Sequence, residues 1–252
     1  MEKSKKSPAN LLKVYQRYLQ LERNYSGNTL EAYLHDVGLL LDYCAQNGLE
    51  VLHVTLEDVQ HFSASLHDLQ VGPRSQARVL SGLRSFYRFL VLDGFIENDP
   101  TELLESPAQA QHLPEVLSTQ EVDMLEAAVD LSKAEGHRNR TIIEVLFSCG
   151  LRVSELVNLK LSHLYLDDGF IRVGGKGNKE RLVPISPRAI RELRFWFDDR
   201  NRLTIKPGQE DYVFLNRRGH RLTRTMILII IKRLAEAAGI QKTISPHTLR
   251  HS

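Results

Sequence analysis

Basic side chains occur in three settings that suit phosphate binding. Arg152 follows a glycine of the kind that ends a helix, and Lys176 lies in a glycine-rich turn. His247 and Arg250 are three residues apart at the start of an expected helix, whose dipole also favours an anion. A guanidinium binds two phosphate oxygens at once, and an ammonium donates a proton to a leaving oxygen. Together these residues point to a phosphodiester as the target.

Each of these residues also has a plainer interpretation. Glu155 lies three residues after Arg152, so it either orients the guanidinium or forms an ordinary ion pair at a helix start. Lys176 is also typical of an exposed lysine in a turn. Lys179 and Arg181 compete with it for the same role, or they bind neighbouring phosphates of a polyanion.

A metal or nucleotide site is a weaker interpretation of the same segments. His247 and His251 are four residues apart, as two metal ligands would be, but no cysteine or acidic residue has suitable spacing to complete the set. The stretch 174–179 lacks the glycine spacing and the following helix of a nucleotide-binding loop. We therefore expect phosphate chemistry without a metal or other cofactor.

The elements that must position these residues can be read from capping and periodicity. Ser118 and Glu121 form the pattern of a capping box and predict a helix. The further elements expected in this half are a helix at 140–148, a hairpin of strands 170–173 and 181–185, a helix from Pro187 through Trp196, a strand at 212–215, and helices at 223–238 and from Ser245 onward.

The first half reads as four helices. They are expected at 9–23, after a cap at Ser26 or Asn28, after a cap at Thr55, and at about 74–92. The fourth carries four arginines within an arc of about 120°. They are Arg74, Arg78, Arg84 and Arg88. We predict that this face binds a polyanion through its phosphates; the alternative is a solvated arginine face.

Length and charge support two domains with different roles. The chain has 252 residues, enough for two cores, and the proline-containing stretch 97–116 reads as a linker between domains at 1–96 and 117–252. Residues 1–110 carry 10 basic and 14 acidic side chains, whereas the remainder carries 23 and 17. The second half is therefore the part of the chain whose net charge favours binding to an anion.

Cysteine usage and hydropathy indicate the cytoplasm. The two cysteines, Cys44 and Cys149, lie among apolar residues, which is typical of a reducing compartment. The first residues lack the apolar core of a signal peptide, and the longest apolar run, 226–231, is too short to span a bilayer. We expect a cytoplasmic protein with no role in a membrane.

Three motifs, taken in order, resemble the catalytic boxes of the tyrosine recombinases. They are Gly150-Leu151-Arg152-Val153-Ser154-Glu155-Leu156, Gly175-Lys176-Gly177-Asn178-Lys179-Glu180-Arg181, and Ser245-Pro246-His247-Thr248-Leu249-Arg250-His251-Ser252. Within that family the similarity is greatest to the bacterial Xer-type enzymes. The segment 28–33 resembles part of their N-terminal core-binding domain, so the resemblance covers essentially the whole chain.

The resemblance implies a mainly α fold with a small β-sheet. A four-helix, SAM-like core-binding domain and a mixed α+β catalytic domain would hold duplex DNA between them. Arg152 and Arg250 would bind the scissile phosphate, Lys176 would protonate the departing 5′ oxygen, and His247 would assist proton transfer. The family's nucleophile is a tyrosine that forms a 3′-phosphotyrosyl link.

The resemblance also implies partners. These are a double-stranded recombination site, a second copy or a paired recombinase in a tetramer on DNA, and a septal DNA translocase, for an enzyme at the nucleoid that resolves chromosome dimers. An integrase of a mobile element and a non-catalytic DNA-binding or assembly protein are the alternatives.

The chain departs from the family pattern at its end. None of its eight tyrosines follows Arg250, and the last of them, Tyr212, lies in an apolar segment that does not suit a nucleophile. We therefore expect a fragment, truncated before the nucleophile, that binds DNA without cleaving it and is mostly monomeric in solution.

Overall fold

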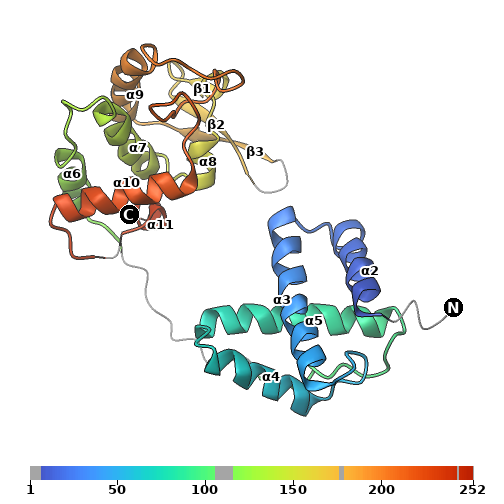
Figure 1. Ribbon diagram of the computed structural model, residues 1–252. Coiled ribbons are helices and arrows are strands. Elements are labelled where there is room, and N and C mark those ends of the chain that lie inside the picture. The colour runs from blue at the N-terminus through green and yellow to red at the C-terminus, as the bar shows by residue number, and fades with distance from the viewer. Residues whose placement is uncertain (1–6, 106–115, 176–178, 243, 252) are drawn as a thin grey trace. The chain divides into compact units, whose positions relative to one another are not determined.

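The computed structural model describes residues 7–105, 116–175, 179–242 and 244–251, which fold into two compact units (Figure 1). The units are Met1–Gln111 and His112–Ser252, so the division falls inside the stretch expected as a linker. The chain is mainly helical, as expected from the sequence. No helix within these described ranges is long and apolar enough to cross a membrane.

The first unit contains the four expected helices, α2 (Pro8–Leu21), α3 (Gly27–Asn47), α4 (Leu56–Asp68) and α5 (Pro73–Leu92). Local signals explain their ends: Thr55 caps α4 in a capping box with Asp58, and Gly48 ends α3 in the left-handed conformation. The helices share a core in which α5 contributes the largest set of buried side chains.

Part of the expected linker packs on the first unit. Leu104 is buried in its core, and its carbonyl accepts a hydrogen bond from Arg84 of α5. Asp99 accepts hydrogen bonds from the backbone and the hydroxyl of Thr101, which is itself fully buried. The Arg84 hydrogen bond therefore ties Leu104 to α5, and the Asp99 hydrogen bonds hold the turn before it.

The second unit combines six helices and a three-stranded sheet among its described residues. The helices are α6 (Thr119–Ala127), α7 (Gly136–Ser148), α8 (Val153–Val157), α9 (Pro187–Arg200), α10 (Arg224–Ala237) and α11 (Pro246–His251), with a 3₁₀ turn, η1 (Leu161–His163), after α8. The capping box of Ser118 and Glu121 is formed as predicted. Helix α7 begins earlier than expected, at Gly136, where an added Cβ would lie 2.6 Å from the carbonyl oxygen of Asp130, so that only glycine fits.

The sheet contains the predicted hairpin and one additional short strand. Strands β2 (Phe170–Gly174) and β3 (Glu180–Pro184) pair antiparallel, with Val173 opposite Arg181, and β1 (Leu164–Tyr165) pairs with the other edge of β2. Val173 and Val183 are buried, so one face of the hairpin packs on the core.

The prediction of a strand at 212–215 is wrong. Only isolated bridges link Tyr212 to Lys160 and Leu215 to Arg221. The reason is that side chains take carbonyls that a strand would use for pairing. Trp196 Nε1 donates to the Val213 carbonyl at 2.9 Å, while Arg200 and Arg138 donate to the carbonyls of Tyr212 and Leu215.

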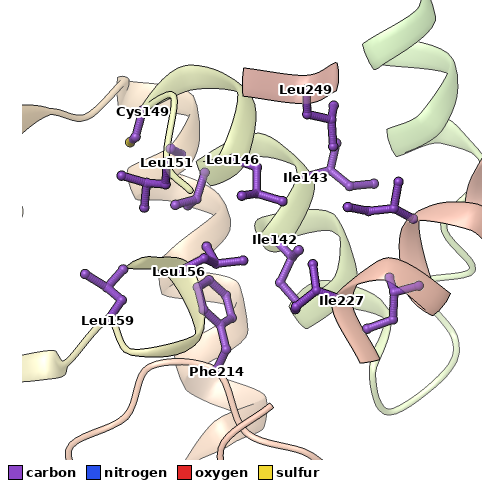
Figure 2. Close-up of a cluster of buried hydrophobic side chains, with 14 of the residues drawn as sticks. Ile142, Ile143, Leu146, Cys149, Leu151, Leu156, Leu159, Phe214, Ile227 and Leu249 are labelled. Atoms are coloured by element: carbon purple, nitrogen blue, oxygen red, sulfur yellow. The ribbon is translucent and has the colours of Figure 1, made fainter. Parts of the chain in front are cut away.

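Helix α7 lies at the centre of the second unit's core (Figure 2). Its side chains Ile142, Ile143 and Leu146 are completely buried, and Leu249 of α11 lies beside Ile143. Leu151, just after α7, is equally buried. The same helix therefore supports the segments that carry Arg152 and Arg250.

A cluster of ion pairs with three buried carboxylates joins α6, α7 and α9. Arg188 of α9 contacts three carboxylates at once, those of Asp123, Glu126 and Glu144, and its Nε lies 3.3 Å from Glu144 Oε2. Arg140 Nε lies 3.6 Å from Glu126 Oε2 and 3.5 Å from Oε1 of Glu192. Two arginines thus face four carboxylates.

Candidate active site

A turn and an apolar anchor place Arg152 at the start of α8. Gly150 has a φ of +55°, in the left-handed region that suits glycine, and turns the chain after α7. Leu151 then inserts into the core, so Arg152 emerges in an extended conformation with its side chain 51% exposed. The guanidinium is anchored at its base and open to a ligand.

Glu155 is the centre of this site. Its side chain is only 3% exposed, yet it is surrounded by donors. Oε2 accepts from the backbone N–H of Arg152 at 2.8 Å, and Oε1 accepts from Arg152 Nη1 at 2.9 Å. These contacts fit both the orienting role and the ordinary ion pair considered for Glu155, and the carboxylate also accepts from a backbone donor at the helix start.

The hairpin brings a second guanidinium to the same carboxylate. Arg181 of β3 donates from Nη1 to Oε1 of Glu155 at 2.9 Å and from Nη2 to Oε2 at 3.2 Å. Its side chain is 39% exposed. Two half-exposed cations around one buried anion leave a net charge of +1 at the surface, which favours an anionic ligand. Sequence reasoning placed Arg181 with the DNA-binding residues and missed this contact.

The tip of the hairpin lies beyond what the structure describes. Lys176, expected to be the proton donor, is outside the described residues. At the base of the tip, the Gly175 N–H donates to the carbonyl of Lys179 at 2.7 Å, and the Lys179 side chain is exposed. The roles of Lys176 and Lys179 stay predictions.

Arg250 is carried by α11, as the sequence predicted. Ser245 Oγ accepts from the Thr248 N–H at 3.3 Å, and Thr248 Oγ1 accepts from the Ser245 N–H at 3.1 Å, so the helix start is capped in both directions. Leu249 anchors the helix on α7, and Arg250 is partly exposed. The side chains of His247 and His251 lie outside the described residues, so their roles, including a metal site, stay untested.

The arginine face of α5 is partly committed to internal contacts. Arg78 Nη1 lies 2.6 Å from Oδ2 of Asp36 on α3, a residue with no exposed surface, and Arg84 bonds the Leu104 carbonyl. Arg74 and Arg88 are exposed, and neither has a hydrogen-bond or ion-pair partner within the described part of the chain. The DNA-binding prediction for all four stays open.

Asp36 was missed by sequence reasoning, although a signal was present. It occupies a position on the apolar stripe of α3, four residues before Leu40 and three after Tyr33. Burial raises the pKa of this carboxyl, and Arg78 opposes that rise.

The two tyrosines of the second unit are engaged in packing. Tyr165 stacks on Phe170 with ring centroids 4.8 Å apart. Arg221 lies over the ring of Tyr212, 5.2 Å from its centroid. The sequence-based rejection of Tyr212 as a nucleophile stays a prediction.

Comparison with known proteins identifies the family. Residues 115–252 match the model of the phage integrase family, and residues 12–94 match that of the phage integrase N-terminal SAM-like domain. The tyrosine recombinase XerD of Chlorobaculum tepidum is 38% identical over 244 residues, which cover 96% of this chain and 80% of the relative. XerD of Staphylococcus aureus (strain Mu50) is also 38% identical, over 96% of this chain and 82% of the relative.

Solved structures share the fold at lower identity. The XerH recombinase bound to its palindromic difH substrate superposes with a TM-score of 0.75 at 21% identity, over 98% of this chain and 72% of XerH. A lambda integrase dimer bound to a COC′ core site gives 0.72 at 17% identity, over 96% of this chain and 86% of that structure. The SAM-like unit, the α+β unit and the Xer relatives agree, and the chain belongs to the phage integrase family of tyrosine recombinases.

Proposed function

We propose that this chain provides the DNA-binding and phosphate-activating parts of a Xer-type site-specific recombinase. The observation that carries the proposal is the Arg152 guanidinium, held by a buried carboxylate through one nitrogen and half exposed. Arg250, on a helix anchored to the same α7, is the second phosphate ligand. An arginine pair stabilises the charge that develops on a five-coordinate phosphorus.

In the proposed reaction a tyrosine oxygen attacks the scissile phosphorus. The bond to the 5′ oxygen breaks, Lys176 gives that oxygen a proton, and His247 accepts the proton of the tyrosine. The proposed nucleophile is a tyrosine that follows the Arg250 box, and the ring contacts of Tyr165 and Tyr212 support this choice over those two residues. The phosphotyrosyl bond conserves the energy needed for religation.

The proposed setting is the bacterial nucleoid. The solved complexes of XerH and lambda integrase contain DNA, and one lambda integrase structure is a tetramer on a Holliday junction. We propose by analogy that this protein acts on duplex DNA as a tetramer with itself or a paired recombinase. Regulation by a septal DNA translocase, during resolution of chromosome dimers, belongs to the same proposal.

The test separates chemistry from binding. A chimaera would continue the chain after Ser252 with the residues that follow the corresponding box in the Staphylococcus aureus relative. On a nicked duplex carrying that relative's site, it should form a covalent DNA adduct, which Arg152→Ala should reduce by roughly 100-fold or more. Binding should weaken far less, because Arg152 is one of many phosphate contacts.

Arg202→Ala is the matched control, because Arg202 is an 80% exposed arginine of the same unit, whose ion-pair partner among the described residues is Asp199. It should leave the adduct yield unchanged. The enzyme proposal fails if the chimaera binds the site and forms no adduct while the relative itself does.

A further inference from the structure

The backbone register of β3 directs Arg181 toward the protein rather than toward solvent. Arg181 pairs with buried Val173 across the hairpin and lies two residues before buried Val183, on the same face of the strand. From that face its guanidinium reaches Glu155, 26 positions earlier in the chain. A side chain that contacts DNA would be expected on the opposite, exposed face of β3.

The contacts of Glu155 are saturated. A carboxylate has about four acceptor positions, and here each oxygen receives two donors. Oε1 accepts from Nη1 of Arg152 and of Arg181, while Oε2 accepts from the Arg152 backbone N–H and from Arg181 Nη2. Arg181 therefore binds both oxygens of the Glu155 carboxylate, which we call the two-point position. The Arg152 side chain makes a single hydrogen bond to Glu155.

The two hydrogen bonds from Arg181 limit how Arg152 can bind Glu155. Guanidinium and carboxylate groups pair preferentially through two parallel hydrogen bonds. If Arg181 were absent, two acceptor positions of a buried carboxylate would open beside Arg152, and its guanidinium would turn a second N–H toward them. Its remaining donors would then be directed at Glu155 instead of at a ligand.

We propose that Arg181 is a positioning residue: by occupying the two-point position on Glu155 it keeps the Nε and Nη2 donors of Arg152 available for the scissile phosphate. The inference rests on the proposed function for its consequence in catalysis. Because Arg181 is carried by β3, which follows the lysine-bearing tip, the same contact also ties the hairpin to the start of α8.

The competing role for Arg181 is a direct phosphate contact, and salt dependence distinguishes the two. Each phosphate contact contributes about 0.9 to the slope of log K against log salt. Arg181→Gln should lower the slope for duplex binding by clearly less than about 0.9, because its charge is paired with Glu155, whereas Lys179→Gln, which removes an exposed charge from the same hairpin, should lower it by about 0.9. A loss of about 0.9 for Arg181→Gln would overturn the proposal.

Chemical modification reports on Arg152 without requiring catalysis. The rate at which phenylglyoxal modifies Arg152 is measured by mass spectrometry, with exposed Arg74 as the internal reference. In Arg181→Gln, Arg152 should react several-fold more slowly, because two of its side-chain N–H groups would then be hydrogen-bonded to Glu155. The modification rate of Arg74 should not change. An unchanged Arg152 rate would sink the idea, and this readout stays decisive even if the chimaera proves inactive.

Catalysis supplies the third measurement. In the chimaera, Arg181→Gln should lower the rate of adduct formation by roughly 10–100-fold at unchanged DNA affinity, since small errors in orientation are costly. Arg181→Lys keeps the charge but cannot fill both oxygens, so it should fall between wild type and Arg181→Gln. Trp196 emission shows whether Arg181→Gln folds. If it does not fold, Arg181→Lys takes its place. The proposal is then contradicted if Arg181→Lys shows the Arg152 modification rate and the adduct rate of the wild type.

Discussion

Glu126 is the residue at which pH should alter the stability of the second unit. Its side chain is 2% exposed, and burial, followed by the neighbouring Glu144, raises its pKa to about 7, although Arg188 opposes the shift. Burial outweighs the effect of Arg188, because this guanidinium is shared with Glu144 and Asp123. A proton on Glu126 therefore stabilises the folded unit.

The sign of the pH effect follows from that raised pKa. The stabilisation is fully present below the unfolded pKa of about 4.5 and is lost as pH rises through about 7. The free energy of unfolding should fall by on the order of 1–3 kcal/mol between pH 5 and pH 8. Urea unfolding at several pH values, followed by Trp196 fluorescence, measures it.

Glu126→Gln should flatten this dependence. Glu135→Gln is the control, because Arg217 lowers the pKa of Glu135 and its own contribution changes only in more acidic solution. A pH profile that is as steep in Glu126→Gln as in the wild type would contradict the assignment.

At the residue scale, local pairs were predictable and distant ones were not. Glu155 lies one helical turn from Arg152, so spacing alone indicated their contact. Arg181 reaches the same carboxylate only because a hairpin returns the chain, and its type and position equally suited DNA binding. The pairing of Asp36 with Arg78 likewise depends on how α3 crosses α5.

At the element scale, the crossing of α3 and α5 depends on Gly82. A Cβ at this position would lie 2.9 Å from both Cβ and Oδ2 of Asp36, whose carboxylate is fixed by Arg78. The steric contact in Gly82→Ala should therefore destabilise the first unit by about 1–3 kcal/mol. The higher helix propensity of alanine should offset up to about 1 kcal/mol of this loss. Urea unfolding followed by far-UV circular dichroism measures the change.

Gly38→Ala is the matched comparison within the same helix pair. Nothing lies within 4 Å of a Cβ at Gly38, so only the gain in helix propensity applies. This variant should be neutral or more stable by up to about 1 kcal/mol. Equal destabilisation of the two variants would show that the contact with Asp36 is not the cause.

The helices were predictable where their ends are set by neighbouring residues. The caps at Thr55, Ser118 and Ser245 needed only a few adjacent side chains, and each was found as predicted. The segment 212–215 has a strand-like composition, but Trp196, Arg200 and Arg138 use its carbonyls. Those donors come from α7 and α9, which no local pattern could reveal.

At the scale of the whole molecule, the two units have separate cores. No buried residue belongs to both clusters among the described residues, and the only tryptophan in the sequence, Trp196, lies in the second unit. We predict that urea unfolding shows different transitions by tryptophan fluorescence and by far-UV circular dichroism, because fluorescence reports on one unit alone.

The glycine variant tests this independence. Gly82→Ala should shift the circular-dichroism transition of the first unit and leave the Trp196 transition in place. Coincident transitions that shift together would mean that the two units unfold as one.

The packing of α11 on α7 also sets an order of events during synthesis. Arg152 leaves the ribosome well before Arg250, separated by roughly 5–20 s at ordinary elongation rates. The helical first unit is complete before either. We therefore expect the nascent protein to acquire the fold of its SAM-like unit first, and to bring Arg152 and Arg250 onto the same core only after α11 has emerged and packed on α7.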